Sequence, residues 1–249
     1  MKRLAGKTAI ITGGASGFGE AMAKRFAAEG ANVVVADLNL VGAEKVAAEI
    51  GKSAIAAHAD VTRKEDVELM VKSAMDAFGR IDIMINNAGF THRNGPMLGV
   101  DEATFDLITG VNMKAIYYAA LAVVPIMERQ GGGSIITTAS TAGLRPRPGL
   151  TWYNASKGWA ISATKSMAVE LAPKNIRVNC LCPVAGETPM LGLFMGEDTP
   201  EKRAQFKATV PLGRLSTPLD VANAALWLAS SEAEFITGIA LEVDGGRCI

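Results

Sequence analysis

The clearest chemical signal in the sequence is a tyrosine and a lysine four residues apart, Tyr153 and Lys157. On a helix, side chains at this spacing share one face. A lysine ammonium beside a phenol stabilises the phenolate, so we expect Lys157 to lower the pKa of Tyr153 from about 10 toward neutrality. A tyrosine tuned in this way can act as a general acid or base on an alcohol or ketone oxygen. Ser140 ends a predicted strand thirteen residues earlier, close enough in a parallel sheet to bind the same oxygen.

A glycine-rich turn follows the first apolar run of the chain, in the order Thr12-Gly13-Gly14-Ala15-Ser16-Gly17-Phe18-Gly19. Glycines permit positive φ angles and let a pyrophosphate approach the backbone closely. The helix that we expect to begin here offers free N–H groups and the positive end of its dipole. Such a turn could also be a plain strand-to-helix connection, but its place after the first strand favours dinucleotide binding.

Asp37 ends the second predicted strand, eighteen residues after Gly19. A carboxylate there can accept hydrogen bonds from both hydroxyls of an adenosine ribose, and it would repel a 2′-phosphate. No lysine or arginine is adjacent, so the sequence favours NAD over NADP as cofactor. The plainer alternative is an aspartate that caps the next turn.

Two further turns follow the third and fourth predicted strands, Asp60-Val61 and Asn86-Asn87-Ala88-Gly89. Open α/β sheets bind ligands at the carboxyl ends of their strands. Asparagine-rich turns are also common without any function, so each of these is a weak indication alone.

The elements that must position these residues alternate along the chain as apolar runs and longer helical patterns. We expect strands at Thr8–Thr12, Val33–Ala36, Ala54–Ala57, Ile81–Asn86, Ser134–Thr138, Val178–Leu181 and Ile239–Val243. We expect helices at Gly19–Glu29, Gly42–Glu49, Lys64–Phe78, Glu102–Arg129, Tyr153–Ala172, Glu201–Thr209 and Pro218–Ala229. Short continuous apolar runs are typical of strands buried on both faces of a parallel sheet. The pattern predicts a single doubly wound α/β domain over residues 1–249, of the Rossmann type, with seven parallel strands and helices on both faces.

Charge and cysteine usage exclude several functions. Lysine plus arginine and aspartate plus glutamate both number 25, so the formal net charge is zero. A neutral chain lacks the excess positive charge that would attract a nucleic acid or an anionic membrane. The cysteines at 180, 182 and 248 are too few for a disulfide framework, and the two histidines lie too far away in sequence to complete a metal site.

No targeting segment is visible, and the apolar stretch Ala115 to Met127 is too short to cross a bilayer. We therefore expect a cytoplasmic protein with a small-molecule substrate and no nucleic-acid, membrane or metal partner.

Two helical segments, Met113–Met127 and Trp159–Leu171, are apolar or nearly uncharged on every face. A helix that is apolar all round must be covered all round. A thick core would explain this, but helices on a sheet in a monomer keep a polar outer face, so a subunit interface is favoured.

Together these motifs resemble the short-chain dehydrogenase/reductase family, in its compact branch of about 250 residues. The residues that carry the resemblance are Thr12-Gly13-x-x-x-Gly17-x-Gly19, Asn86-Asn87-Ala88-Gly89, Ser140, Tyr153-x-x-x-Lys157 and the ending Val243-Asp244-Gly245-Gly246. The resemblance covers the whole chain and implies a catalytic tetrad of Asn112, Ser140, Tyr153 and Lys157. It implies that Tyr153 exchanges a proton with the substrate oxygen, that Ser140 orients the substrate, and that Lys157 binds the nicotinamide ribose and tunes Tyr153. Asn112 would hold a water that continues the proton relay.

The residues expected to bind the nicotinamide cofactor are Gly13, Ser16, Gly17, Phe18, Gly19, Asp37, Asp60, Val61, Asn87, Ala88, Gly89, Tyr153, Lys157, Pro183, Val184 and Thr188. One position departs from the family pattern, because Val184 stands where a glycine usually follows Pro183, while Thr188 is in place. The departure leaves hydride transfer unaffected but puts the shape of the neighbouring loop in doubt.

The substrate side is less determined. His92, Arg93, Arg145, Arg147 and Trp152 lie near the predicted site, and four potential cations around one mouth indicate a carboxylate, phosphate or sulfonate on the substrate. They could equally be surface or interface side chains. Residues 189–209 have the amphipathic pattern of a lid over substrate, although an ordinary exposed helix pair would look the same.

We therefore expect an NAD(P)-dependent oxidoreductase that transfers hydride between a nicotinamide cofactor and a secondary alcohol or ketone of the 3-oxoacyl, sugar, polyol or hydroxy-acid type. Members of the family that this chain resembles commonly form tetramers. Together with the two apolar helices, this favours a homotetramer, a dimer of dimers. The alternatives are a catalytically silent NAD-binding regulator, which the intact tetrad argues against, and a purely structural oligomer, which gives no reason for the tetrad and Asp37 to occur together.

Overall fold

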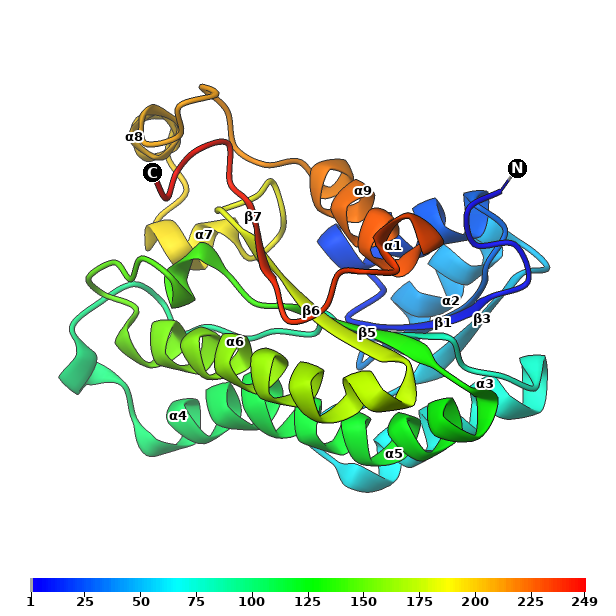
Figure 1. Ribbon diagram of the computed structural model, residues 1–249. Helices are drawn as coiled ribbons and strands as arrows, with labels where there is room; N and C mark the ends of the chain where they lie inside the picture. The colour runs from blue at the N-terminus through cyan, green and yellow to red at the C-terminus, as the bar shows by residue number, and fades with distance from the viewer. Residues whose placement is uncertain (1) are drawn as a thin grey trace.

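The computed structural model describes residues 2–249, so only Met1 of the expected domain lies outside it. Seven strands form one sheet in the order β3-β2-β1-β4-β5-β6-β7, and every neighbouring pair is parallel (Figure 1). The strands are β1 Thr8–Thr12, β2 Asn32–Asp37, β3 Ala54–His58, β4 Ile83–Asn86, β5 Gly133–Thr138, β6 Ile176–Pro183 and β7 Ala240–Val243. The predicted Rossmann-type fold is confirmed.

Helices cover both faces of the sheet (Figure 1). They are α1 Gly17–Ala28, α2 Leu40–Ile50, α3 Lys64–Phe78, α4 Glu102–Thr109, α5 Ala115–Gln130, α6 Thr151–Leu171, α7 Leu191–Met195, α8 Pro200–Ala208 and α9 Pro218–Ala229. One core lies between the sheet and α1, α2 and α9, where Phe26 and Leu226 pack on Ile11. The other lies beneath α3, α5 and α6, where Met70 and Val123 pack on Ile10. Successive strand residues point to opposite faces, so continuous apolar runs fill both cores at once.

One expected element is interrupted. The helix predicted from Glu102 to Arg129 is α4 and α5 joined by a π-helical turn over Gly110–Lys114, in which the Ala115 N–H bonds to the Gly110 carbonyl. A π turn holds one more residue than an α turn, and such turns are frequent at functional sites. Here the turn contains Asn112, which is 2% exposed.

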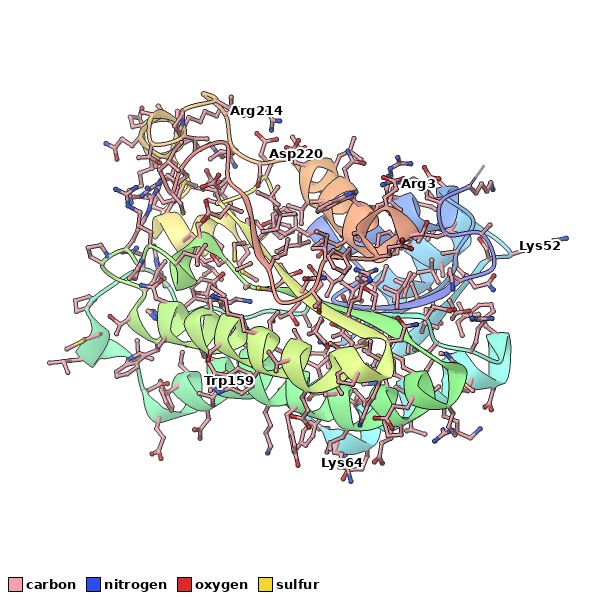
Figure 2. All side chains as sticks on the ribbon, viewed as in Figure 1. Arg3, Lys52, Lys64, Trp159, Arg214 and Asp220 are labelled. Atoms are coloured by element: carbon pink, nitrogen blue, oxygen red, sulfur yellow. The ribbon has the colours of Figure 1, made fainter. Side chains whose placement is uncertain are left out.

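The outer surface of the lower helix layer is unusually apolar. By length and composition alone, the helical stretch Glu102–Gln130, with its π turn, could cross a membrane. Its inner side packs on the sheet through buried Ala119, Val123 and Met127. On the outside, Tyr117 is 54% exposed, and Trp159, labelled on α6 in Figure 2, is 38% exposed.

Candidate active site

A cavity of about 850 Å³ runs along the carboxyl ends of the strands. This is the size of an ordinary ligand or cofactor pocket, and this edge is where open α/β sheets bind ligands. Of the residues expected to bind the cofactor, all but Gly19 line it. The structure therefore brings together side chains from the whole length of the chain.

The glycine-rich turn forms the floor of the cavity. Gly13 and Gly17 have φ angles of 65° and 55°, a left-handed conformation that only glycine adopts without strain. Gly19 does not face the cavity, because a Cβ there would lie 2.0 Å from the Gly13 carbonyl oxygen. Its role is to let the first turn of α1 pack on the loop.

The amino end of α1 is open toward the cavity. Ser16 is its N-cap residue, and its side chain makes no capping hydrogen bond. Ser16, Gly17 and Phe18 all line the cavity. Free N–H groups at a helix N-terminus suit a phosphate, so this turn fits the pyrophosphate of a dinucleotide.

Asp37 lines the cavity at the end of β2. One carboxylate oxygen accepts a hydrogen bond from Ala15 N at 3.0 Å, and the other accepts one from Asn39 N at 2.9 Å. The capping role considered from the sequence is thus present. Two carboxylate oxygens offer about four acceptor sites, so ribose hydroxyls can still be bound.

Asn87 ties three strand ends together beneath the cavity. Its amide Nδ2 donates to Thr12 O at 3.0 Å, and its Oδ1 accepts from Thr138 Oγ1 at 3.2 Å. The N–H groups of Asn87 and Ala88 both donate to Thr12 Oγ1. This asparagine turn therefore fixes the ends of β1, β4 and β5 relative to one another.

Tyr153 lies on the first turns of α6 and is 5% exposed. Burial raises the pKa of its phenol to about 12, and a hydrogen bond with Ser140 opposes that rise. The expectation that Lys157 lowers this pKa toward neutrality is wrong for the protein alone. The physical reason is that desolvation of the phenolate outweighs its attraction to the ammonium.

Lys157 is directed past the phenol. Its Nζ donates to Thr138 O at 2.8 Å and lies 5.6 Å from the centroid of the Tyr153 ring. Burial lowers the pKa of this ammonium to about 8, because few groups around it replace water. The lysine is thus held at the wall of the cavity with a proton that it can lose near neutral pH.

Asn112 stands behind these residues and does not line the main cavity. Its Oδ1 accepts from Phe90 N at 2.9 Å, and its Nδ2 donates to Phe90 O at 2.8 Å and Ser156 Oγ at 2.9 Å. Both amide protons are used in these contacts, and one of the two acceptor sites of Oδ1 is free. The side chain positions the Phe90 strand-end loop and α6, and the free acceptor site could bind the water assigned to Asn112 by resemblance.

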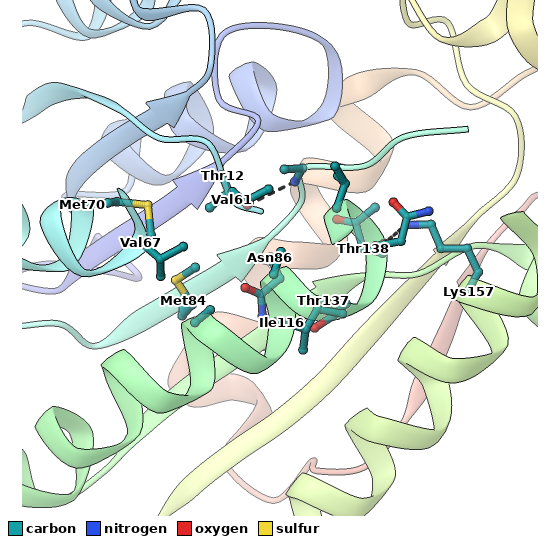
Figure 3. Close-up of a pocket in the computed structure, with 15 residues that line it drawn as sticks. Thr12, Val61, Val67, Met70, Met84, Asn86, Ile116, Thr137, Thr138 and Lys157 are labelled. Atoms are coloured by element: carbon teal, nitrogen blue, oxygen red, sulfur yellow. Dashed lines mark hydrogen bonds between the residues drawn. The ribbon is translucent and has the colours of Figure 1, made fainter. Parts of the chain in front are cut away.

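A second, small cavity of about 10 Å³ lies under the site, between Asn112, Lys157 and the methionines of the core (Figure 3). This is room for about one water molecule. Figure 3 shows Lys157 reaching from α6 toward Thr138 at its edge. Asn86 and Thr137, both buried, supply polar groups to its wall.

Val184 extends β6 rather than distorting it. Its N–H donates to Val243 O at 3.2 Å, and Val184 lines the cavity as expected. Gly186 makes the close approach in this loop, because a Cβ there would lie 2.5 Å from the Phe18 ring. The loop thus tolerates valine because the tight contact falls two residues later.

The cations expected around the substrate divide into two groups. Arg145 and Arg147 line the cavity. His92 is buried with its Nδ1 2.9 Å from Arg93 O, and Arg93 Nε donates to Gly196 O at 2.7 Å. Neither His92 nor Arg93 lines the cavity.

Trp152 is also outside the cavity, with its ring edge-on to Phe105 and its Nε1 donating to Met97 O. It precedes Tyr153 on α6, and neighbouring helical residues point about 100° apart. The sequence analysis did not predict several residues of the cavity wall, among them Arg247 and apolar side chains. These additional lining residues are Asn94, Leu107, Leu150, Met190, Phe194, Phe206 and Arg247.

The segment expected to form a lid contains two short helices, α7 and α8. Its apolar side chains point in two directions, some into a small core and one into the cavity. Leu191 and Met195 pack on Leu215 in a small core, whereas Phe194 faces the cavity with its ring centroid 5.2 Å from that of Tyr153.

Near the carboxyl end of the chain, Glu242, Asp244 and Cys248 place potential metal-ligand atoms within 4.8 Å of one another. The Asp244 carboxylate already accepts from Gly246 N at 2.9 Å and Cys248 N at 2.7 Å. Burial and Asp244 raise the pKa of the Cys248 thiol to about 11, which opposes thiolate ligation. This group therefore shapes a turn.

Comparison with known proteins places this geometry in context. A family model described as enoyl-(acyl carrier protein) reductase matches residues 13–247. The chain is 47% identical over 247 residues to 4-formylbenzenesulfonate dehydrogenase of Comamonas testosteroni, covering 98% of each chain. It is 39% identical over 251 residues to a 3-oxoacyl-[acyl-carrier-protein] reductase of Thermotoga maritima, covering 99% of this chain and 100% of the relative. The crystal structure of 3-ketoacyl-(acyl-carrier-protein) reductase from Brucella melitensis complexed with NADH matches with a TM-score of 0.94 and 48% identity, covering 99% of this chain and 100% of that one.

Proposed function

The chain belongs to the short-chain dehydrogenase/reductase family, and we propose that it uses NAD(H) to interconvert an alcohol and a carbonyl compound that carries an anionic group. As a member of that family it is an oxidoreductase that transfers hydride with a nicotinamide cofactor. The relatives named above are dehydrogenases and reductases, and none supports the alternative of a silent regulator. The finer proposal rests on one observation, the three arginines that line the substrate end of the cavity.

The proton chemistry follows from the geometry of Tyr153 and Ser140. The phenol with its high pKa is a proton donor at neutral pH, suited to a carbonyl oxygen that becomes an alcohol. The Ser140 hydroxyl, within hydrogen-bonding reach of the phenol, orients that oxygen. When bound, the nicotinamide cofactor supplies or accepts the hydride. In the reverse direction the phenolate form of Tyr153 takes the proton from the alcohol.

The preference for NAD rests on Asp37. The carboxylate faces the adenosine end of the cavity, where a 2′-phosphate would meet a like charge. The cavity lining includes no lysine or arginine at that end that could neutralise such a phosphate. The Brucella melitensis reductase with bound NADH is consistent with this choice.

The anionic substrate is proposed from charge and from one relative. Arg145, Arg147 and Arg247 line the cavity, and no aspartate or glutamate in residues 2–249 forms an ion pair with any of them. Arg145 contacts the terminal oxygen Ile249 O. Guanidinium groups without an acidic side chain as partner favour an anionic ligand. The Comamonas testosteroni relative is named for a substrate with a sulfonate on an aromatic ring. Phe194 and Phe206 offer rings against which a planar substrate could pack.

The experiment is a matched pair of substrates followed by NADH absorbance. We expect 4-formylbenzenesulfonate to give a kcat/KM at least tenfold above that of the uncharged 4-formylbenzenesulfonamide. The alcohols that correspond to both compounds test the opposite direction. Equal values for the charged and neutral compounds would exclude the anionic substrate. A short 3-oxoacyl thioester that is turned over faster than all of them would instead favour reduction of acyl groups.

The assembly and location are also part of the proposal. We infer a homotetramer in which the outer faces of α5 and α6 are buried between subunits, since Tyr117, Leu121 and Val169 are 54%, 48% and 81% exposed in the single chain. A subunit interface would account for the apolar outer face of the Glu102–Gln130 helix without a membrane. We further propose that the protein is cytoplasmic and that residues 189–209 close over substrate.

A further inference from the structure

We propose that Arg247 is the residue that selects the anionic substrate, with Arg145 as its positioning residue. The inference rests on the proposed function and assigns its specificity to the turn after β7. Arg247 lies six residues beyond Leu241, the middle of the last strand, and its side chain lines the same cavity as Tyr153.

Arg247 is distinguished from the other two arginines by what its guanidinium contacts. Its Nε is buried and has no hydrogen-bond partner within residues 2–249. A buried donor without a partner is costly, so a small movement of the side chain that brings Nε to an anion in the adjacent cavity would be favourable. Arg147 donates to Thr209 Oγ1 at 3.1 Å and lies 5.3 Å from the Phe206 ring centroid, so part of its capacity is already used.

The turn that carries Arg247 is built to hold it in place. Asp244 is buried, and its carboxylate accepts from Gly246 N and Cys248 N on either side of Arg247. Gly245 and Gly246 have φ angles of 62° and 86°, so the chain can reverse here without strain. A Cβ on Gly245 would lie 2.7 Å from Val210, which shows how closely this turn packs on the loop after α8.

Arg145 closes the turn from the other side. Its Nη1 donates to Arg247 O at 3.5 Å and to Ile249 O at 3.4 Å. These long contacts connect the loop after Ser140 with the main chain around Arg247. Arg145 thereby fixes the backbone from which the Arg247 side chain extends into the cavity.

Sheet topology separates this positive end from the acidic one. Within residues 2–249, the only carboxylate side chains that line the cavity are those of Asp37, which ends β2, and Asp60, which follows β3. Arg247 follows β7, at the opposite edge of the seven-stranded sheet. A carboxylate or sulfonate held by Arg247 therefore meets no acidic side chain at its own end of the cavity. The planar guanidinium can contact two oxygens of such a group at once.

The test measures binding of a non-reacting anion. Benzenesulfonate and the neutral benzenesulfonamide are compared as competitive inhibitors against the carbonyl substrate, in wild type, Arg247→Met and Arg247→Gln. We expect both variants to raise the inhibition constant of benzenesulfonate about ten- to a hundredfold, as for loss of a charged hydrogen bond. The constant of benzenesulfonamide should move by less than about twofold. Circular dichroism establishes which variants are folded, and the glutamine variant, which keeps a polar group of similar reach, serves if the methionine variant is not.

The matched control is Lys52→Met, which removes one positive charge at the far side of the molecule, before β3 (Figure 2). It should leave both inhibition constants unchanged. Arg145→Met should raise the inhibition constant of benzenesulfonate and leave that of benzenesulfonamide nearly unchanged, because it acts through the position of Arg247. If wild type binds the two inhibitors equally, the anionic substrate of the proposed function fails. If wild type discriminates and folded Arg247 variants discriminate as well, that function stands and the assignment to Arg247 is overturned.

Discussion

Lys157 Nζ lies 5.6 Å from the centroid of the Tyr153 ring, yet it donates its 2.8 Å hydrogen bond to the carbonyl of Thr138. The ammonium is thereby held at the end of β5 beside the phenol without contacting its oxygen. Burial then acts on the two groups in opposite directions, raising the pKa of Tyr153 to about 12 and lowering that of Lys157 to about 8. Both changes favour the uncharged forms.

The first prediction concerns proton transfer. With the phenol pKa near 12, carbonyl reduction should change little between pH 6 and 8, and alcohol oxidation should become faster as pH rises. Tyr153→Phe should lower kcat about 10²- to 10⁴-fold in both directions, because only the transferable proton is removed. Steady-state rates over pH, with NADH affinity from fluorescence as the control, would check this. A variant within threefold of wild type would remove Tyr153 from the mechanism.

The second prediction concerns the cost of burying Lys157. Its pKa is lower in the folded protein than its ordinary 10.5, so the unfolded chain binds more protons between pH 8 and 10.5. Stability from this group therefore rises through that window, and below pH 8 the charge costs up to about 3 kcal/mol. Lys157→Met should lose activity yet show a smaller gain in unfolding free energy between pH 7 and 10 than wild type. Urea denaturation at the two pH values measures this, and an identical gain in both proteins would contradict it.

The third prediction concerns cofactor choice. Wild type should prefer NADH to NADPH, because Asp37 faces the place of a 2′-phosphate. Asp37→Ser should reduce that preference by at least about tenfold, the effect of removing one repulsive contact of about 1.4 kcal/mol. Specificity constants for both cofactors decide the matter. A wild type that already favours NADPH would show that Asp37 does not have this role.

The fourth prediction concerns the glycine-rich turn. Gly19→Ala should abolish NADH binding or unfold the protein, because its Cβ would lie 2.0 Å from the Gly13 carbonyl oxygen. Gly99→Ala is the matched control, since nothing lies within 4 Å of a Cβ there and its φ is not positive. Calorimetric titration with NADH and thermal melting of both variants provide the measurement. Normal NADH binding by a folded Gly19→Ala variant would be incompatible with this packing.

The fifth prediction concerns assembly. Tyr117→Glu on α5 should dissociate the proposed tetramer, because a charge in a buried apolar interface is left unpaired. Light scattering at micromolar concentration should report a tetramer for wild type and smaller species for the variant. Leu69→Glu on α3, where the wild-type residue is 59% exposed, is the control and should leave the assembly intact. A monomeric wild type would refute the proposal.

The fold and much of the site could be predicted from sequence because they depend on short-range patterns. The strands are continuous apolar runs, and the Tyr153–Lys157 spacing and the glycine-rich turn are local. The direction of Trp152 was missed although it adjoins Tyr153, because proximity in sequence does not place two helical residues on one face. The angle of about 100° between neighbouring helical side chains would have predicted that Trp152 points away from the site.

Other features depend on contacts between distant segments and leave no local signal. Arg247 reaches the cavity because Asp244 folds the turn and Gly245 packs on Val210, thirty-five residues earlier in the chain. The pKa of Tyr153 depends on burial, which the completed fold determines. Motif spacing could identify the tyrosine and lysine as a pair, but it could not give the balance between desolvation and attraction.

The π turn at Gly110–Lys114 has a consequence for how this site could change. The turn contains one residue more than a regular helix needs, so a single deletion there could restore continuous α-helix. The flanking helices would keep their relative phase, because the π turn already absorbs the extra residue, but Asn112 would lose the bulge that directs it toward Phe90 and Ser156. The connection between the loop after β4 and the tyrosine helix is thus encoded by the length of the chain as well as by its side chains. In this region, an insertion or deletion would alter the site more deeply than many substitutions.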